Sequence, residues 1–300
     1  MKYEYHSIES CAMCGASATF FRTLGKRLNK SQGKNPRGKV GITTTIQQCK
    51  KCDLIFSNPL PIPESLQDHY GMPPESYWVE SYFEVDPNYF LGVIQWLQQQ
   101  MPIQKGMKAL DIGAGIGKSM IALERVGFDV YGIEPSIPFY ERALSRTKIS
   151  PDRITNEAIE EADFEVEQFD FITFGAVLEH LYDPGLSIEK ALTWLKPGGL
   201  IHIEVPSANW LTNRLINRYY RMRGLDYVAN LSPMHEPFHL YEFGLKSFQA
   251  HAANHGYQIA DHQFMVCDTF LPSALDFILK PYMAKTKKGM QLAILLRKEP

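Results

Sequence analysis

The sequence predicts an α/β protein built on a largely parallel sheet, with a small metal-binding module at its N-terminus. Three observations lead to this prediction. Residues 107–206 alternate between short apolar runs and amphipathic runs, a glycine-rich turn joins the first of these runs to the second, and four of the five cysteines form two C-x-x-C pairs. Strands that alternate with helices need crossover connections, which place the strands parallel in one sheet.

The chain divides into three predicted parts. Residues 1–57 hold both cysteine pairs, residues 58–105 form a mostly helical linker that caps the substrate side, and residues 106–300 hold the α/β domain. A chain of 300 residues, of which 45% are hydrophobic, can bury one sizeable core beside a small module.

Two cysteine pairs predict a metal site in the first part. Cys11 and Cys14 form one pair, Cys49 and Cys52 form the other, and four thiolates suit tetrahedral Zn²⁺ in a closed structural site. The alternatives are four ordinary cysteines or a ribbon that has lost its metal. Residues 22–39, between the pairs, hold seven Lys and Arg and no acid, which predicts a solvated loop.

A helix is predicted near the end of the linker. Asp86 followed by Pro87 is typical of an N-cap with proline at the first helical position. The apolar residues that follow share one helical face: Phe90, Val93, Ile94 and Leu97. We therefore expect a helix that begins at Pro87 and runs through Leu97.

The elements of the α/β domain follow from the hydrophobic pattern. The expected strands before residue 207 are 107–112, 129–134, 169–177 and 200–206. The expected helices between them are 118–127, 138–146 and 187–195. Beyond them we expect a helix at 245–256, a strand at 257–266, a helix or lid at 268–282 and a last strand at 290–298.

The turn after the first strand is the most informative segment. It comprises Asp111, Gly113, Ala114, Gly115 and Gly117. Glycines let a ligand approach the backbone at the start of a helix, and the next strand ends at Glu134, whose carboxylate can accept both hydroxyls of a ribose. A dinucleotide site would read G-x-G-x-x-G, but the last position here holds Lys118, which weakens that interpretation.

This segment resembles motif I of the class I S-adenosylmethionine-dependent methyltransferases, which reads D/E-x-G-x-G-x-G. The resemblance continues in order through YGIEPS (131–136), FDFITFGAVLEHLYDP (169–184) and LKPGGLIHIEVP (195–206). It implies a Rossmann-like sheet of seven strands, flanked by helices and with an antiparallel last strand, and S-adenosylmethionine as the methyl donor. The alternatives are a dinucleotide-dependent oxidoreductase and a Rossmann-like domain without activity.

The resemblance also implies which residues hold the cofactor. Asp111 and residues 113–117 would cradle its methionine part, and Glu134 would hold its ribose. Four residues would line the adenine: Pro135, Ser136, Ala158 and Ile159. Two residues would close the pocket near the methyl group: Phe174 and Gly175.

The cysteine pairs and the α/β domain together resemble bacterial methyltransferases with an N-terminal zinc ribbon. Several of these act on sugars, nucleotide-linked sugars or other biosynthetic intermediates, so the resemblance implies a small-molecule acceptor, which we expect to be methylated at oxygen. Residues 213–223 contain four arginines in a region that usually covers the substrate in this fold, and these could bind an anionic acceptor. A helix with a solvated arginine face is the alternative.

Two histidines are candidate general bases for an oxygen acceptor. His180 follows the strand at 169–177, and His239 lies in PFHLYEF, where the resembled family places a histidine in the substrate pocket. Family members often carry an acid directly before that histidine, but here the position holds Phe238, and Glu236 lies close in sequence. His180 could instead be a structural residue of a turn.

Parts of the sequence also suggest three other functions, namely a protease, an RNA methyltransferase and a binding module. Residues 235–239 match the H-E-x-x-H pattern of zinc proteases, but Pro237 disfavours the helix that this motif needs, so we reject a protease. An RNA methyltransferase stays open because the basic segment 22–39 could bind nucleic acid, although only Phe21 is near for base stacking. A binding module that keeps the fold without catalysis is the third hypothesis.

Composition gives no general attraction to polyanions. The formal net charge is −2, so neither nucleic acid nor an anionic membrane attracts the chain as a whole. The first ten residues contain no apolar leader, and no apolar run approaches the roughly 18 residues of a spanning helix. We therefore expect a cytoplasmic protein that does not enter a membrane.

Overall fold

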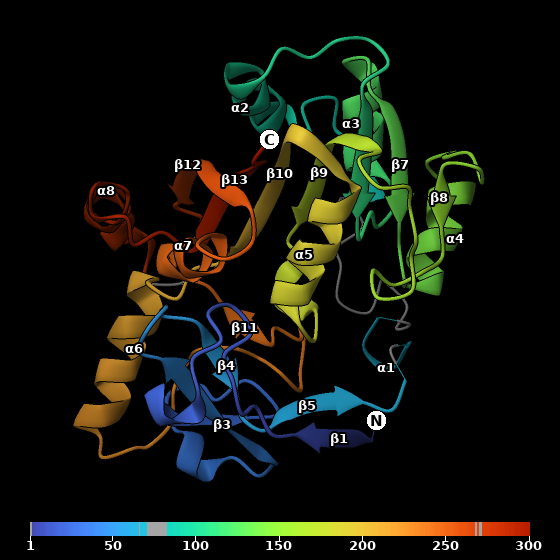
Figure 1. Ribbon diagram of the computed structural model, residues 1–300. Helices are drawn as coiled ribbons and strands as arrows, with labels where there is room; N and C mark the ends of the chain where they lie inside the picture. Colours follow the sequence, from blue (N-terminus) through green and yellow to red (C-terminus); the bar gives the residue numbers. More distant parts are fainter. Residues whose placement is uncertain (1, 66, 71–82, 268, 270–271) are drawn as a thin grey trace.

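Two sheets organise the protein, a seven-stranded sheet in the C-terminal two thirds and a four-stranded sheet beside it (Figure 1). A further pair of short strands lies next to the smaller sheet. The computed structural model describes residues 2–65, 67–70, 83–267, 269 and 272–300. No helix in the described part of the chain is both long enough and apolar enough to cross a membrane.

The large sheet has the strand order β12-β13-β10-β9-β6-β7-β8. Its strands are β6 (Lys108–Ile112), β7 (Asp129–Ile133), β8 (Ile154–Thr155), β9 (Phe169–Gly175), β10 (Leu195–Pro206), β12 (Tyr257–Met265) and β13 (Gln291–Lys298). The strands from β8 to β10 run parallel, and β13 lies antiparallel between β10 and β12. The predicted seven-stranded sheet with an antiparallel last strand is therefore confirmed.

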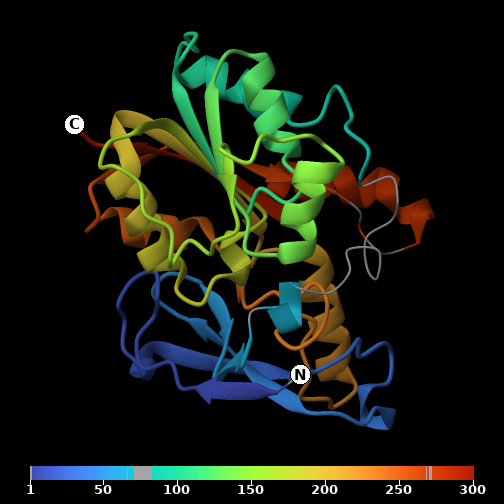
Figure 2. The same cartoon turned by 90° about the vertical axis from the view of Figure 1, so that its right-hand side faces the viewer.

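Helices cover both faces of the large sheet (Figure 2). On one face lie α2 (Leu91–Gln100), α3 (Lys118–Arg125) and α4 (Ile137–Ser145), and on the other lie α5 (Pro184–Trp194) and α7 (Leu245–Ala252). Because both faces are covered, the central strands carry apolar residues on both faces, as in Phe171, Ile172 and Phe174 of β9, none of which is exposed. The expected helices at 118–127, 138–146, 187–195 and 245–256 are confirmed. All four end earlier than expected, and α4 and α5 also begin earlier, at Ile137 and Pro184.

The small sheet combines three strands from the N-terminal part of the chain with one strand from its later part. Its strands are β2 (Phe21–Leu28), β3 (Thr43–Cys49), β4 (Ile55–Ser57) and β11 (Tyr241–Glu242), in the order β11-β4-β3-β2. The separate pair consists of β1 (Tyr3–His6) and β5 (Leu60–Pro63). β11 therefore adds a strand from the C-terminal region to a sheet that is otherwise N-terminal.

The prediction of a solvated loop at residues 22–39 is wrong for residues 22–28, which form most of β2. Leu28 is buried and Leu24 is half-buried, but a register shift between Thr23 and Gly25 breaks the period-2 pattern, so the strand does not show alternation in the sequence. Arg27 is tied down as well, because its Nε donates a hydrogen bond to the Leu231 carbonyl oxygen at 2.7 Å.

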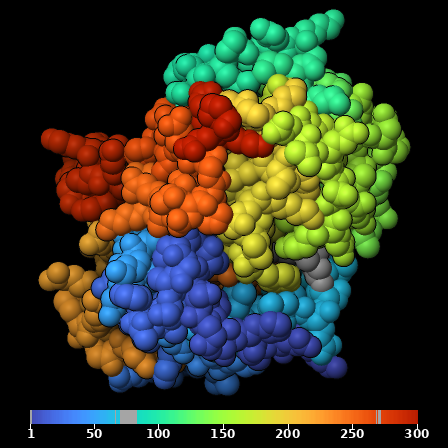
Figure 3. All heavy atoms as spheres, in the orientation of Figure 1, coloured from blue at the N-terminus to red at the C-terminus, as the bar shows by residue number. Residues whose placement is uncertain are grey.

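The N-terminal strands share a core with the large sheet. Cys11, Cys49 and Phe56 belong to the same buried apolar cluster as Phe243 and Phe248. In the space-filling view, the N-terminal residues, drawn in blue, pack directly beneath the orange and yellow segments that hold α7 and α5 (Figure 3). The three-part division of the chain stays a prediction. Because residues 1–57 share this core with the α/β domain, a test of the division must consider both parts together.

The predicted start of the linker helix is wrong. α2 begins at Leu91 rather than at Pro87, because Phe90 has a φ of +65°, a left-handed conformation that a helix cannot contain. A turn precedes it, in which the Asn88 amide donates to the Asp86 carboxylate at 2.8 Å.

The remaining helices lie outside the central layers. They are α1 (Gln67–Tyr70), α6 (Leu211–Met222) and α8 (Asp276–Thr286). α6 extends beside the small sheet and α8 beyond the edge strand β12 (Figure 1). Of the predicted helix or lid at 268–282, residues 268 and 270–271 lie outside the described residues, and a helix begins at Asp276.

Candidate active site

A cavity of about 710 Å³ lies beyond the carboxyl ends of β6, β7, β9 and β10. Ligands of open α/β sheets bind at this edge, and the volume falls in the range of roughly 300–1,000 Å³ typical of small-molecule sites. One side, which we call the glycine wall, includes Gly113, Gly115 and Glu134. A second group of lining residues, which we call the histidine wall, includes Glu179, His180 and His239.

The glycine wall begins where β6 turns into α3. Gly113, Gly115 and Gly117 all have positive φ, at +69°, +57° and +81°. At Gly113 a Cβ atom would lie 2.5 Å from Cγ2 of Val177, so any side chain there would meet both backbone strain and a clash. The bare turn therefore brings backbone close to the cavity.

Glu134 lies at the end of β7, the strand next to the turn. Its Oε2 accepts a hydrogen bond from the Gly115 amide at 2.7 Å, and its Oε1 accepts one from the Ser136 amide at 2.8 Å. Burial raises the pKa of Glu134 to about 7, although both amides lower it. These contacts hold the carboxylate at the cavity wall, where it could accept hydroxyl groups of a ribose.

Asp111 lies behind the turn and does not line the cavity. Its Oδ2 is buried and has no hydrogen-bond partner among the described residues. Burial, and next the charge of Glu134, raise the pKa of Asp111 to about 8. An unpaired buried carboxyl oxygen beside an open turn fits a ligand that brings hydrogen-bond donors, as the methionine part of S-adenosylmethionine would.

The other predicted cofactor residues divide into two groups. The cavity is lined by Pro135, Ser136, Ala158, Ile159 and Gly175. It is not lined by Ala114, Gly117 or Phe174. Phe174 is fully buried because its side chain points into the apolar core, whereas Gly175, at the end of the same strand, is exposed at the cavity.

The histidine wall combines two segments that lie far apart in the sequence. Glu179 and His180 belong to a short 3₁₀ turn after β9, and His239 precedes β11. The backbone amide of Leu240 donates to the Glu179 carbonyl oxygen at 2.9 Å, which fastens the two segments together. The imidazole centroids of His180 and His239 are 5.0 Å apart.

One carboxyl group faces both imidazoles of this wall. Oε1 of Glu179 lies 3.8 Å from Nε2 of His239 and 3.9 Å from Nε2 of His180. The His180 Nδ1–H donates to the Phe238 carbonyl oxygen at 3.4 Å, which leaves Nε2 of His180 toward Glu179. The three groups form a compact acid–histidine cluster at the surface of the cavity.

Burial keeps this cluster uncharged near neutral pH. It raises the pKa of Glu179 to about 8 and lowers the pKa of His180 to about 4. Burial, followed by the charge of His180, lowers the pKa of His239 well below its usual value. Both imidazoles are therefore neutral at pH 7 and able to accept a proton.

Sequence reasoning missed Glu179 as the acid that faces His239. Glu236, the residue close to His239 in sequence, is exposed, whereas Glu179 is 2% exposed. The sequence did contain one indication of Glu179, namely its position directly before His180 in the segment LEHL. The H-E-x-x-H segment at 235–239 contains no helix, in agreement with the rejection of a protease.

Aromatic side chains from residues 88–96 cover the cavity. Tyr89, Phe90 and Trp96 contribute to its lining, and the Trp96 indole N–H donates to Asp261 at 2.7 Å. The four arginines of residues 213–223 do not line the cavity, and all of them are exposed: Arg214, Arg218 and Arg221 on α6, and Arg223 directly after it. Their predicted contact with the acceptor therefore finds no support in their placement.

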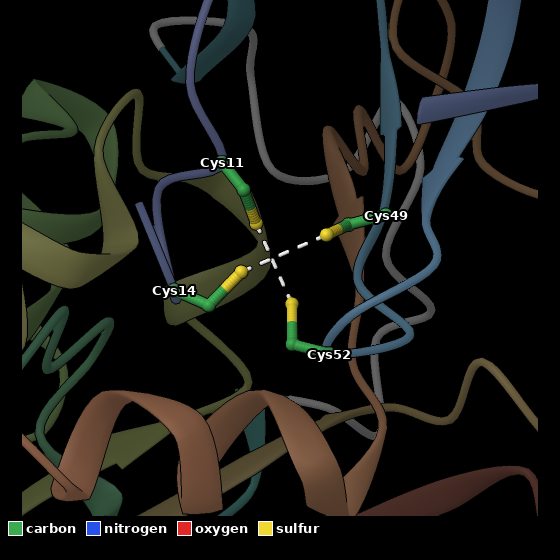
Figure 4. Close-up of side chains that lie close together, drawn as sticks. All are labelled: Cys11, Cys14, Cys49 and Cys52. Carbon is green, nitrogen blue, oxygen red and sulfur yellow. Dashed lines mark hydrogen bonds between the residues drawn. The ribbon is translucent and has the colours of Figure 1, made fainter. Parts of the chain in front are cut away.

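The four predicted metal-ligand cysteines converge on one point (Figure 4). Sγ of Cys11 lies 3.4 Å from Sγ of Cys52, Sγ of Cys14 lies 3.6 Å from Sγ of Cys49, and all four sulfurs fall within 4.8 Å of one another. Tetrahedral Zn²⁺ with Zn–S bonds of about 2.3 Å would place its sulfurs about 3.8 Å apart. The thiols are free and could hold such an ion.

The glycine wall and the sheet behind it match a known protein family. The family model for a methyltransferase domain matches residues 88–262, which is more than half of the chain. This span contains both walls of the cavity and ends before the last strand of the large sheet.

Curated relatives match a shorter part of the chain. The ubiquinone biosynthesis O-methyltransferase of Bradyrhizobium diazoefficiens is 31% identical over 134 residues, which cover 43% of this chain and 49% of that protein. The enzyme of the same description from Coxiella burnetii is 30% identical over 143 residues, which cover 47% and 58%. The chain thus matches about half the length of these relatives.

Solved structures share the fold. A SAM-dependent methyltransferase from Archaeoglobus fulgidus superposes with a TM-score of 0.50 at 14% sequence identity, covering 73% of this chain and 97% of that chain. At this identity the likeness concerns the fold alone.

Proposed function

This chain belongs to the methyltransferase domain family, and on that premise we propose that it transfers a methyl group from S-adenosylmethionine to an oxygen of a small-molecule acceptor. One observation carries the proposal: the glycine wall and the histidine wall line the same cavity. A donor held on one wall would face a base on the other. The printed names of the curated relatives, which are O-methyltransferases, support oxygen as the methylated atom.

The cofactor supplies an electrophilic methyl group on a sulfonium, so the residues of this chain need only align the reactants and remove a proton. The open turn at residues 113–117 would receive the methionine part, with Asp111 behind it. Glu134 would bind the ribose, and Pro135, Ser136, Ala158 and Ile159 would line the adenine. Gly175, where a Cβ would meet no atom within 4 Å, leaves space between the two walls.

His239 would act as the general base for the acceptor hydroxyl. Its imidazole is neutral at pH 7 and can therefore take the proton. A positive charge on His239 would favour ionised Glu179, whose Oε1 is 3.8 Å away, so the carboxyl group would stabilise the imidazolium. His180 would orient Glu179 from the other side.

The lining of the cavity favours a neutral acceptor. Four glutamates contribute to it, namely Glu134, Glu160, Glu179 and Glu204, whereas no Lys or Arg does among the residues that the structure describes. An anionic acceptor would meet carboxyl groups without a compensating cation. Aromatic Tyr89, Phe90 and Trp96 would instead pack against an apolar or ring-shaped part of the acceptor.

Methyl transfer to a panel of small alcohols and phenols tests this function. We expect turnover with neutral hydroxylated compounds and less turnover with their phosphorylated or carboxylated analogues, measured as release of S-adenosylhomocysteine. Calorimetry should detect S-adenosylmethionine binding without any acceptor. If calorimetry detects NAD binding but no S-adenosylmethionine binding, the proposal is wrong.

We also propose that residues 1–57 form a module stabilised by structural Zn²⁺ at the four clustered cysteines. Closed Cys₄ sites of this kind contribute directly to folding stability. Replacing Cys49 by Ser should remove one zinc per chain and lower the melting temperature, whereas Cys267→Ser, outside the cluster, should do neither. Equal zinc content in the two variants would contradict the proposal.

An RNA acceptor is the second candidate, and one contact favours it. Tyr220 donates to the Gly33 carbonyl oxygen at 2.7 Å and Arg37 donates to the Gly224 carbonyl oxygen at 2.6 Å, so the basic segment lies against the end of α6. The two segments also carry exposed cations: Lys30, Lys34, Arg37, Lys39, Arg214, Arg218, Arg221 and Arg223. Salt-dependent binding of bulk RNA, together with its methylation, would favour this candidate.

A further inference from the structure

A second cluster of metal-ligating side chains lies away from the cavity and from the four cysteines. It consists of Glu189 on α5, His251 on α7, and His255 in the turn that follows α7. Oε1 of Glu189 lies 3.1 Å from Nε2 of His255 and 3.6 Å from Nε2 of His251. One ligand atom from each residue falls within 4.8 Å of the other two.

The hydrogen bonds of His255 fix which nitrogen faces the carboxylate. Its Nδ1 lies 2.6 Å from the carbonyl oxygen of His251, and because a carbonyl only accepts, Nδ1 carries the proton. In the neutral imidazole Nε2 then has a lone pair, and this lone pair points at Oε1 of Glu189. Two acceptors face each other across 3.1 Å.

The same accounting applies to His251. The Tyr257 hydroxyl donates its proton to the Phe248 carbonyl oxygen at 3.2 Å, so the hydroxyl oxygen is left to accept from Nδ1 of His251 at 3.1 Å. Nε2 of His251 therefore also has a lone pair in the neutral ring. The side chain is 1% exposed, a position in which an uncompensated charge is costly.

The buried Nε2 of His251 lies next to the backbone of Gly185. Nε2 of His251 has no hydrogen bond of acceptable geometry among the described residues, although the backbone of Gly185 lies close. A Cβ at position 185 would lie 3.3 Å from Nε2, so glycine keeps the space beside the nitrogen open. With both imidazoles neutral, two ring lone pairs and one carboxylate oxygen therefore converge at this cluster.

We propose that Glu189, His251 and His255 bind a divalent transition metal ion such as Zn²⁺. Two imidazole nitrogens and a carboxylate oxygen are a ligand set that suits this class of ion. Both rings already have their Nδ1–H hydrogen-bonded, which is the arrangement that orients histidine ligands in metal sites. Glu189 and His255 are 41% and 30% exposed, so the ion can enter from solvent and keep a water ligand.

The site would act as a clip between α5 and α7. These helices pack on the same face of the large sheet, and α5 also contacts the first cysteine pair, because a Cβ at Gly185 would lie 2.1 Å from the Ala12 carbonyl oxygen. An ion at this position would therefore stiffen the seam between the large sheet and the N-terminal module. The inference is independent of the proposed methyl transfer.

Zinc content per chain tests the inference in the full-length protein. After dialysis against Zn²⁺ and removal of free metal, we expect the wild-type protein to hold one zinc more than His255→Ala or Glu189→Gln. The partly exposed position of His255 lets the variant fold, which its melting temperature without added metal would verify. Tyr257→Phe, which removes the acceptor for Nδ1 of His251, should weaken zinc binding roughly 10- to 100-fold.

His6→Ala is the matched control, since His6 is exposed and also approaches a carboxylate, that of Glu4 at 3.3 Å. This variant should hold as much zinc as the wild type. Substitution with Co²⁺ separates the two sites, because only a thiolate site gives intense sulfur-to-metal absorption, which His255→Ala should leave unchanged. Equal zinc content in wild type and His255→Ala, or an equal loss in His6→Ala, would overturn the inference.

Discussion

On the glycine wall the functional groups follow the ends of two adjacent parallel strands, whereas on the histidine wall they come from segments that meet only in the folded chain. Gly113 and Glu134 end β6 and β7, which pair in register. Glu179 and His239 meet because the loop before β11 folds back onto the turn after β9. The arrangement of the first wall follows from the sheet itself, whereas the arrangement of the second depends on the packing of distant segments.

This difference has a chemical counterpart. In the proposed function, the glycine wall would bind the cofactor through backbone and carboxylates, so added volume should weaken it most. The histidine wall would act through the proton affinity of its groups, which burial sets, so a change of charge or of ring should weaken it most. Substitutions should therefore separate binding from turnover, each wall affecting mainly one of them.

The largest effect is expected at the base. His239→Ala should lower kcat by about 10²- to 10⁴-fold, since that is the typical contribution of a general base, while the affinity for S-adenosylmethionine stays the same. Steady-state kinetics and calorimetry measure the two quantities. His180→Ala is the comparison and should lower kcat less. Full turnover in both variants, with the cofactor still bound, would show that neither histidine is the base.

The next effect is expected on the glycine wall. Gly113→Ala should weaken S-adenosylmethionine binding by on the order of 10²-fold, because the methyl group adds backbone strain and a clash with Val177. Gly106→Ala is the control, since Gly106 also has positive φ, at +89°, but a Cβ there meets no atom within 4 Å. If both variants bind the cofactor equally well, space at the turn is not what the site requires.

A smaller effect is expected from Glu179→Gln. The amide keeps the shape of the side chain but cannot ionise, so it cannot stabilise an imidazolium on His239. We expect kcat to fall about 10-fold with little change in KM, because a positioning residue accounts for only part of the effect of the base. The pH–rate profile should also lose the dependence near pH 8 that the raised pKa of Glu179 predicts. An unchanged profile would assign Glu179 a purely structural role.

The smallest effect concerns stability against pH. Asp111, Glu134 and Glu179 have folded pKa values of about 8, 7 and 8, above their unfolded values, so the folded state binds more protons and loses stability as pH rises toward 8. The histidine His180, with its pKa lowered to about 4, acts in the opposite sense, but only below about pH 6.5.

Between pH 6.5 and 8 these carboxyl groups, together with Glu242, whose pKa burial raises to about 7, lose protons that the folded state holds more tightly, so they should lower the melting temperature of the cofactor-free protein by a few degrees. Asp111→Asn removes one of these groups and should reduce the difference. Differential scanning calorimetry at the two values of pH provides the measurement. A rise in melting temperature over this interval would mean that the buried carboxyl groups do not control the stability of the cavity.

How far the sequence predicted the molecule follows from the same contrast. Asp111, the glycines and Glu134 were predictable because the ends of neighbouring parallel strands meet by construction. The pairing of Glu179 with His239 was not, because it depends on the path of a long connection that contains α6. Strand β2 and the start of α2 were not predicted for local reasons. In β2 a register shift between Thr23 and Gly25 breaks the alternation of side chains, and before α2 the left-handed conformation of Phe90 interrupts a helical pattern.

Strand β11 has a consequence for how this protein can be cut or recombined. It follows His239 by one residue and hydrogen-bonds to β4, so residues 1–57 serve as the anchor for the loop that carries the proposed base. A chain shortened to begin at residue 58 would lose that anchor together with its cysteines. Transfer of residues 1–57 to another enzyme would require residues 235–242 to be transferred with them, because β4 and β11 are paired strands of one sheet.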